Sequence, residues 1–254
     1  MTMDYTPTEL LSVMASRMMK GTGTIFAGVG IPLLAAILAK RTHTPGLTIV
    51  VEGGSIGPQV MPGRLPISTN EMRVARRATM LVGINEVFLL TQRGFLEVGF
   101  MGGAQIDRHG NVNTTVVGSY EKPKVRLPGS GGANDIISLC RRTVLVTIHE
   151  KRRFVPKVDF VTSPGFLDGG EDRRRSGLIF GGVSNMVTDL GMMGFDEKTK
   201  EMRLESLHPG VTLDRVIENT GFELLIPDFI PVTEPPTQAE LDELRRLDPD
   251  HRFL

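Results

Sequence analysis

The run of five residues at 47–51 constrains the fold more than any other feature, because it is almost wholly apolar and rich in β-branched side chains. Such runs are typical of parallel strands that are buried on both faces. Residues 24–27 are predicted to form a second short strand, and a helix from Pro32 to about Arg41 separates the two. We therefore expect an α/β fold: an open, mostly parallel sheet flanked by helices, with Rossmann-like topology.

Two capping boxes predict helices near the two ends of the sequence. Thr6 and Glu9 have the spacing of an N-cap residue and its reciprocal partner, and apolar side chains follow at helical intervals. Thr237 and Glu240 repeat this pattern inside a proline-rich tail at 227–254, where we expect one short helix.

The middle of the chain has weaker patterns. From them we predict a helix at 70–80, a strand or helix start at 86–90, a turn at 107–111, and strands at 143–148 and 158–161. No repeat period and no interdomain linker is visible in the sequence. We interpret residues 1–254 as a single domain, an ordinary size for one α/β domain.

The charge balance and the cysteine content exclude several classes of protein. The 29 Lys and Arg residues balance the 29 Asp and Glu residues, so no overall field favours nucleic acid or an anionic membrane. The single cysteine, Cys140, excludes an internal disulfide framework and a Cys-rich metal site, and it favours a reducing compartment. The most apolar stretch, 25–39, contains glycine and proline and is shorter than the roughly 20 residues of a membrane helix. We expect a soluble, cytoplasmic protein.

Other chemistry-bearing residues have simple structural interpretations. Cys140 has apolar neighbours and is expected to be buried. The five histidines lack metal-ligand spacing, and His109 and His149 are interpreted as surface residues. The basic runs 151–153 and 173–175 are interpreted as solvated faces, with contact to a phosphate-bearing ligand or an acidic partner as the alternative.

Glu52 stands directly after the run 47–51, at the predicted carboxyl end of a strand. Ligands of open α/β sheets bind beyond these strand ends. From its position alone Glu52 is a solvated strand-end residue. However, Gly53 and Gly54 follow it, and backbone without side chains lets a ligand approach closely. We therefore predict a reactive carboxylate at Glu52.

A glycine-rich turn at 129–135 is the second candidate element. Three of the four residues at 129–132 are glycine, which is more than one tight strand-to-helix turn needs. Backbone amides at a helix N-terminus are a natural site for an oxyanion or a phosphate. Gly131 and Gly132 are our candidate donors to an oxyanion, and a tight turn without ligand is the alternative.

Two other enzyme classes fit less well. Gly28 and Gly30 follow a strand, as in dinucleotide-binding proteins, but Leu33 stands where the third glycine belongs. Ser130 lacks the Gly-x-Ser-x-Gly elbow of serine hydrolases, because Pro128 stands two residues before it. Acyl transfer onto a carboxylate fits the combination of Glu52 and the glycine turn better than either.

Motifs spread over nearly the whole chain resemble those of family I CoA-transferases, and the likeness is strongest to the β subunit of glutaconate CoA-transferase. They occur in the same order at 49–54, 102–107, 110–113, 129–134, 149–154, 161–165 and 218–222. In this family a Glu-x-Gly motif of the β subunit carries the nucleophile, which matches Glu52 and Gly54 here. The segment 55–58 differs from the glutaconate enzyme, which leaves the acyl group open.

The resemblance implies a CoA-transferase β subunit that works with a separate α subunit, with the active site where the two meet. Glu52 would form an anhydride with a small acyl group, for which dicarboxylic, glutaconate-like acids are candidates, and then a glutamyl-CoA thioester. The resemblance implies coenzyme A as substrate and covalent intermediate, no permanently bound cofactor and no metal.

The implied oxyanion and CoA-binding residues come from three segments of the chain. They are Gly54, Gln105, Asn113, Gly131 and Gly132, with Gln105 and Asn113 as polar residues that line the site. Two alternatives to transfer stay open. One is an acyl-CoA hydrolase, decarboxylase or ring-opening enzyme on the same scaffold, with Glu52 as base, and the other is a non-enzymatic module that binds CoA esters or sugar phosphates.

Overall fold

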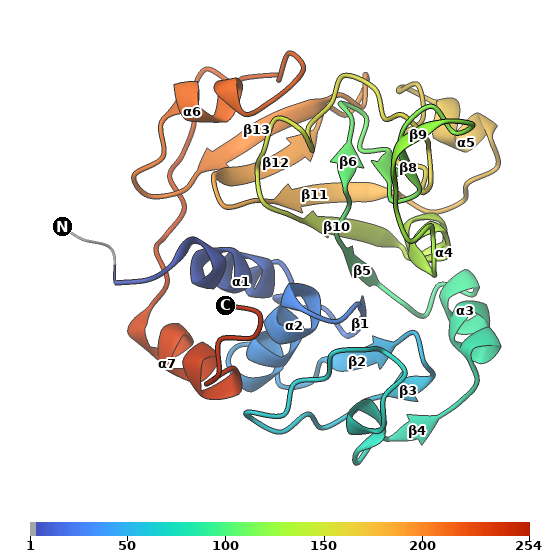
Figure 1. The fold of residues 1–254 in the computed structure, drawn as a ribbon. Helices are drawn as coiled ribbons and strands as arrows, with labels where there is room; N and C mark the ends of the chain where they lie inside the picture. Colours follow the sequence, from blue (N-terminus) through green and yellow to red (C-terminus); the bar gives the residue numbers. More distant parts are fainter. Residues whose placement is uncertain (1–3) are drawn as a thin grey trace. The chain divides into compact units, whose positions relative to one another are not determined.

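A computed structural model describes residues 4–254, which divide into two compact units (Figure 1). Unit 1 comprises the chain up to Met101 together with Pro235–Leu254, and unit 2 comprises Gly102–Glu234. The chain therefore leaves unit 1 once and returns to it for its last helix. Among residues 4–254 no helix combines the length and the apolarity needed to cross a membrane.

The sheet of unit 1 has the strand order β5-β1-β2-β3-β4. Its strands are β1 (Thr24–Ala27), β2 (Thr48–Val51), β3 (Ser55–Ile56), β4 (Met80–Leu81) and β5 (Val98–Met101). Strand β1 pairs in parallel with both β2 and β5, while β3 and β4 add antiparallel pairs beyond β2. The three parallel strands are buried almost throughout, as apolar runs of this kind predict.

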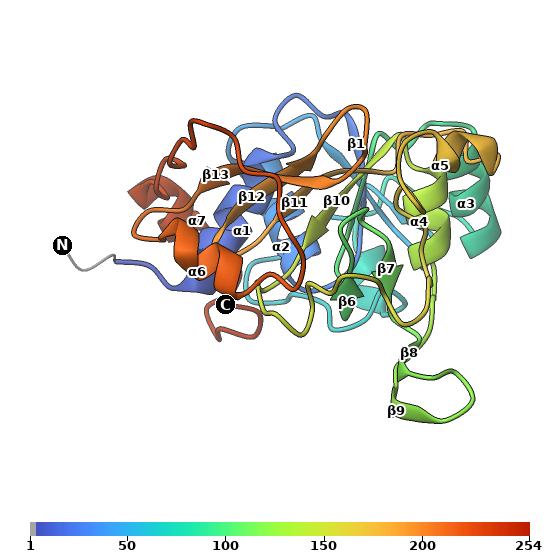
Figure 2. The same cartoon turned by 90° about the horizontal axis from the view of Figure 1, so that it is seen from above.

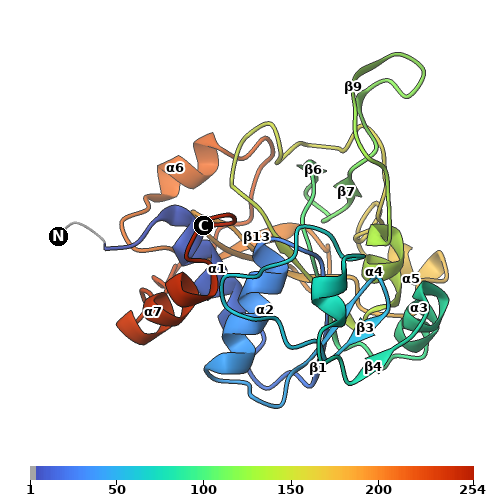
Figure 3. The same ribbon diagram turned by 60° about the horizontal axis from the view of Figure 1, so that its bottom comes forward.

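Three helices of unit 1 pack against one another (Figure 3). They are α1 (Pro7–Arg17), α2 (Ile31–Arg41) and α7 (Gln238–Leu247), and unit 1 also contains α3 (Ile84–Gln92). Both predicted capping boxes form. Two ion pairs join α1 to α7: Arg17 lies 2.7 Å from Glu240, and Arg245 lies 2.7 Å from Glu9, whose side chain is almost fully buried. The tail helix is therefore part of the core of unit 1.

Unit 2 has the strand order β13-β12-β11-β10, with β10 and β11 parallel and the remaining pairs antiparallel. Two separate hairpins, β6-β7 and β8-β9, complete its strands. The bounds are β6 (Gln105–Ile106), β7 (Val112–Asn113), β8 (Val116–Gly118), β9 (Pro123–Arg126), β10 (Arg142–Val146), β11 (Val183–Val187), β12 (Gly191–Phe195) and β13 (Met202–Leu207). The helices are α4 (Ala133–Leu139), α5 (Asp172–Arg175) and α6 (Leu213–Glu218).

The predicted α/β fold with an open, mostly parallel sheet is confirmed, and two element predictions are wrong. Residues 70–80 form a four-residue 3₁₀ helix, Met72–Ala75, and then strand β4, because Met80 pairs with Ile56 of β3. Residues 158–161 form no strand, because the carboxylate of Asp159 accepts hydrogen bonds from other segments instead of joining a ladder. The segment 86–90 is part of helix α3.

His149 is buried, which contradicts its interpretation as a surface residue. It is 4% exposed, its ring nitrogens lie 3.2 and 3.0 Å from the hydroxyls of Thr188 and Thr220, and its ring stacks on Phe154. Burial lowers the pKa of the imidazole from 6.5 to about 4. His149 is therefore a neutral core residue at neutral pH. Cys140 is buried as predicted, and burial raises the pKa of its thiol to about 12.

Arg173 is also buried, at 5% exposed, so the run 173–175 is not wholly a solvated face. Its guanidinium donates four hydrogen bonds of 2.7–2.9 Å to the carbonyl oxygens of Phe180, Pro164, Gly165 and Ile137. Burial lowers the pKa of the guanidinium to about 10, so it is still charged at neutral pH. A single side chain thus satisfies carbonyl groups from three segments of unit 2.

Replacing Arg173 by lysine should destabilise the full-length chain by about 2–4 kcal/mol, because an ammonium cannot reach all four carbonyls and leaves buried acceptors unpaired. The matched control is Arg174→Lys, whose exposed side chain bonds Glu171. Urea unfolding of the three proteins measures the difference. Equal urea midpoints for the two variants would show that the four hydrogen bonds of the Arg173 guanidinium contribute nothing to stability.

The free energy of unfolding should fall as the pH drops from about 6.5 towards 4, by about 3 kcal/mol from His149 alone. The unfolded imidazole binds a proton below pH 6.5, whereas the folded one resists protonation down to about pH 4, so acid favours the unfolded chain. Above pH 6.5 this contribution is constant. The variant His149→Gln should show a shallower slope in this window in pH-dependent urea titrations, and an unchanged slope would contradict the assignment.

Candidate active site

Glu52 follows β2 directly, at the carboxyl end of the parallel strands of unit 1. It is half-buried, and within residues 4–254 no hydrogen bond or ion pair holds its carboxylate. Ligands approach this edge of an open α/β sheet. Folding therefore places the Glu52 carboxylate at the carboxyl end of β2 and leaves it without a hydrogen bond or ion pair within residues 4–254.

The two glycines after Glu52 make room for the chain itself. A methyl group on Gly53 would collide with the carbonyl oxygen of Thr69, and one on Gly54, at φ 98°, would collide with that of Val82. The amide of Gly54 donates to the carbonyl of Val51 at 3.0 Å, and the Gly54 carbonyl accepts from Val82 at 2.9 Å. Close packing of the loop that carries Glu52 is thus enough to require glycine at positions 53 and 54, without any ligand. The amide of Gly54 already donates within the loop and is not free to bind an oxyanion.

The glycine turn lies in unit 2 and leads into helix α4. Gly129 and Gly131 have φ of 97° and 49°, a backbone geometry that side chains disfavour. The amides of Ser130, Gly131 and Gly132 have no acceptor among the residues that the structure describes. The turn therefore presents unpaired N–H groups, as a site for an oxyanion would.

Hydrogen bonds from two neighbouring segments hold this turn. Two hydrogen bonds of 2.8 Å join Gly129 to Thr114. The Gly129 amide donates to the Thr114 carbonyl, and the Thr114 hydroxyl donates to the Gly129 carbonyl. The side-chain amide of Asn134 donates to the carbonyl of Thr162 at 2.9 Å, and the Thr162 hydroxyl accepts from the amide of Thr114. The position of the turn is thus set by Thr114 and Thr162, which lie outside it.

Gln105 and Asn113 lie next to each other on strands β6 and β7, and both are buried. The Asn113 amide nitrogen donates to the Gln105 side-chain oxygen and to the Val116 carbonyl, each at 2.6 Å. Gln105 in turn donates to Asp159 at 2.9 Å. Their polar atoms are largely engaged by the protein, so the geometry favours an internal, supporting role for both.

The structure thus groups the predicted residues by unit: Glu52 and Gly54 belong to unit 1, and Gln105, Asn113, Gly131 and Gly132 belong to unit 2. Sequence analysis missed Asp159 and Thr162 as individual residues of the polar network around the turn. Thr162 falls inside the motif at 161–165, which was the available signal. Asp159 fell inside a segment interpreted as a strand.

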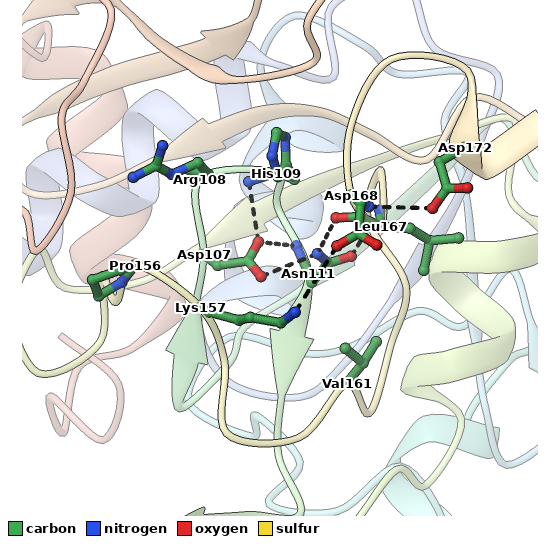
Figure 4. A pocket seen from close by; sticks show the side chains of 10 residues that line it. All are labelled: Asp107, Arg108, His109, Asn111, Pro156, Lys157, Val161, Leu167, Asp168 and Asp172. Atoms are coloured by element: carbon green, nitrogen blue, oxygen red, sulfur yellow. Dashed lines mark hydrogen bonds and ion pairs between the residues drawn. The ribbon is translucent and has the colours of Figure 1, made fainter.

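A cavity of about 380 Å³ lies in unit 2 and contains none of the predicted site residues (Figure 4). Asp107 is buried in its wall and accepts three hydrogen bonds, from the Asn111 side chain and from the backbone amides of His109 and Asn111. Lys157 and Asp168 at the rim lie 4.0 Å apart and are both strongly exposed. The carboxylate of Asp107 is thus bonded within the protein, and Lys157 and Asp168 form an ion pair with each other. No group of three His, Cys, Asp or Glu side chains within residues 4–254 is placed to hold a metal ion.

The coenzyme A transferase family model matches residues 8–219 of this chain. The chain belongs to the coenzyme A transferase family. Among curated CoA-transferases it is similar to the β subunit of the 3-oxoadipate CoA-transferase of Pseudomonas knackmussii, with 40% identity over 96% of this chain and 94% of the relative. It is 38% identical to the β subunit of the glutaconate CoA-transferase of Acidaminococcus fermentans, over 99% of this chain and 96% of the relative.

The resemblance to family I CoA-transferase β subunits is therefore confirmed, and the chain is an enzyme subunit of this family. The crystal structure of the Acidaminococcus fermentans glutaconate CoA-transferase matches it with a TM-score of 0.92 and 37% identity, over 99% of this chain and 98% of that one. The decarboxylase AibA/AibB shares the fold, with a TM-score of 0.84 and 28% identity over 98% of each chain. The scaffold of the CoA-transferases thus also carries other reactions.

Replacing Gly54 by alanine should destabilise this CoA-transferase chain by about 3 kcal/mol or more, because the added methyl meets backbone and the φ is left-handed. Gly46→Ala is the matched control, since a Cβ at Gly46 meets nothing within 4 Å and its φ is not left-handed. Thermal and urea unfolding compare the two variants with the parent. Similar stability of Gly54→Ala and Gly46→Ala would contradict the close approach to Val82.

Proposed function

We propose that this chain is the β subunit of a heteromeric CoA-transferase that moves CoA between a small acyl-CoA and a carboxylate acceptor. The observation that carries the proposal is the uncommitted carboxylate of Glu52 at the end of strand β2, in a chain of the coenzyme A transferase family. The partner is an α subunit, and the active site lies where the two chains meet. The similarity to the β subunits of two named CoA-transferases supports this partner.

The substrate we propose is a dicarboxylic acyl group. Glutaconate and 3-oxoadipate, the acids named for the two similar enzymes, are both dicarboxylic acids. We propose a cytoplasmic enzyme that uses CoA as a substrate and holds neither a metal nor a permanent cofactor.

In the first step the Glu52 carboxylate attacks the thioester carbonyl of the acyl-CoA. The carbon–sulfur bond breaks, and a mixed anhydride and CoA thiolate form. The thiolate then attacks the Glu52 carbonyl carbon, which releases the first acid and leaves a glutamyl-CoA thioester on the enzyme. The acceptor acid reverses both steps. No oxidant, reductant or additional base is required.

The unpaired amides of the glycine turn are the donors that we assign to the oxyanion, with Gly131 and Gly132 as the residues. One such donor is typically worth about 3–4 kcal/mol of barrier. Gln105 and Asn113 act by holding the strands and turns around it, and Gly54 acts by shaping the Glu52 loop. Water must be excluded during the reaction, because an anhydride hydrolyses readily.

Glu52→Gln in the αβ complex should abolish transfer, by about 10³-fold or more, because the amide is not a nucleophile toward the thioester. Glu197→Gln, an exposed position in unit 2, is the control and should keep full activity. Incubating the parent complex with glutaryl-CoA, reducing with borohydride and mapping the modified peptide should locate the adduct on Glu52. Full transfer activity in Glu52→Gln, or an adduct elsewhere, would refute the assignment.

The same assay separates transfer from the other reactions of this scaffold. The similar chains include the decarboxylase AibA/AibB and a cholesterol ring-cleaving hydrolase IpdB subunit from Rhodococcus jostii, 30% identical over 97% of this chain and 94% of the relative. A transferase consumes acyl-CoA only when a carboxylate acceptor is present. Turnover with acyl-CoA and water alone would favour the alternative, an acyl-CoA hydrolase, decarboxylase or ring-opening enzyme.

A further inference from the structure

The β8-β9 hairpin extends away from the rest of unit 2 (Figure 2). Its base is continuous with the glycine turn, because β9 ends at Arg126 and the turn begins at Gly129. The backbone amides of Leu127 and Gly129 donate to the carbonyls of Thr115 and Thr114, which fixes the hairpin and the turn to the same short segment. A strand of four residues spans about 13 Å, so the hairpin tip is well separated from the turn.

Three cations lie on the second half of this hairpin, and we name them the cationic arm: Lys122 lies in the loop directly before β9, and Lys124 and Arg126 lie in β9 itself. Lys124 and Arg126 stand at alternate positions of β9 and therefore share a face of the strand. Neither lysine has a hydrogen-bond or ion-pair partner within the described part of the chain, and the same segment carries one carboxylate, Glu121. Exposed cations that are not paired by their own protein form a site for anionic groups.

An aromatic pair holds the arginine of the cationic arm in place. The rings of Tyr120 and Phe160 stack with centroids 5.5 Å apart, and both side chains are exposed. The Arg126 guanidinium lies 4.9 Å from the Tyr120 ring centroid and donates to the Tyr120 carbonyl at 3.1 Å. Its other N–H groups have no acceptor among the residues that the structure describes. A fixed guanidinium with unpaired donors is suited to phosphate.

We propose that the cationic arm binds the phosphate groups of the nucleotide part of coenzyme A, with the exposed apolar surface at Phe160 and Val161 beside the adenine ring. This inference rests on the proposed function, which makes CoA the substrate. CoA carries its thioester on a long pantetheine chain, with a diphosphate and a 3′-phosphate at the other end. Lys122, beside the hairpin tip, is separated from the glycine turn in the same way, while Arg126 lies between the two.

The arrangement divides CoA recognition into two parts. The glycine turn meets the thioester, where bonds change, and the cationic arm meets phosphates that do not react. Contacts to the non-reacting part raise affinity and hold the thioester in position. Charge-assisted hydrogen bonds to phosphate are strong enough for two lysines to change affinity by about tenfold to a hundredfold.

The test is calorimetry on the αβ complex with three probes: CoA, dephospho-CoA, which lacks the 3′-phosphate, and pantetheine. The parent should bind CoA more tightly than dephospho-CoA, and both more tightly than pantetheine. The double variant Lys122→Glu/Lys124→Glu should lower the affinity for CoA about tenfold to a hundredfold and leave the affinity for pantetheine unchanged. It should also make the affinities for CoA and dephospho-CoA nearly equal. Lys122→Arg/Lys124→Arg should restore CoA binding. Lys198→Glu, an exposed lysine of another turn, is the control with unchanged affinity.

Unchanged CoA affinity in the double glutamate variant would overturn the proposal. Size-exclusion light scattering measures the molar mass of the complex formed by that variant. A lower molar mass with CoA affinity retained would also overturn the proposal, and it would show that the hairpin contacts the partner subunit instead. The measurement repeated in a Glu52→Gln complex keeps the two proposals apart. CoA binding there should still depend on the cationic arm, whether or not Glu52 proves to be the nucleophile.

Discussion

The chemistry that we propose for this chain depends on one carboxylate that folding leaves without a hydrogen bond or ion pair within residues 4–254. An unpaired charge is costly to remove from water, so buried carboxylates are normally held by cations or hydrogen bonds. Unit 1 shows this usual pattern at Glu9, which is almost fully buried and is bonded by Arg245. Glu52, in the same unit, is half-buried and unpaired within residues 4–254. The contrast distinguishes a carboxylate that stabilises the fold from one that is available for reaction.

Two different kinds of contact fix the two loops to which we assign the reaction. In unit 1 the absence of side chains at Gly53 and Gly54 lets backbone pack directly on backbone, and the Glu52 loop follows from that contact. In unit 2 hydrogen bonds with Thr114 and Thr162 hold the glycine turn from outside. Each kind of contact fixes a loop and leaves unbonded the group to which we assign the reaction. That group is the Glu52 carboxylate in unit 1 and the backbone amides of the glycine turn in unit 2.

Patterns that depend on neighbouring residues were predictable from sequence, and those that depend on distant ones were not. The apolar run at 47–51 and both capping boxes are local, and the strand and the two helices form where they were expected. Asp159 is bonded by groups 41 and 54 residues away, so the prediction of a strand in its segment was wrong. His149 and Arg173 find partners in other segments, and charge or polarity alone made them look exposed. The position of Glu52 at the end of a strand is likewise a local property, and the structure places it there as predicted.

The chemistry that we propose for Glu52 favours a two-chain enzyme. In the mechanism that we propose, water at the Glu52 carboxylate would hydrolyse the anhydride before the acceptor acid arrives. An ordinary carboxylate is also a weaker base than the thiolate it must displace, so attack needs a dry site with fixed donors. Among the residues that the structure describes, no side chain covers the Glu52 carboxylate through a hydrogen bond or an ion pair. On our proposal a second polypeptide covers the Glu52 carboxylate and supplies the dry site that the reaction needs.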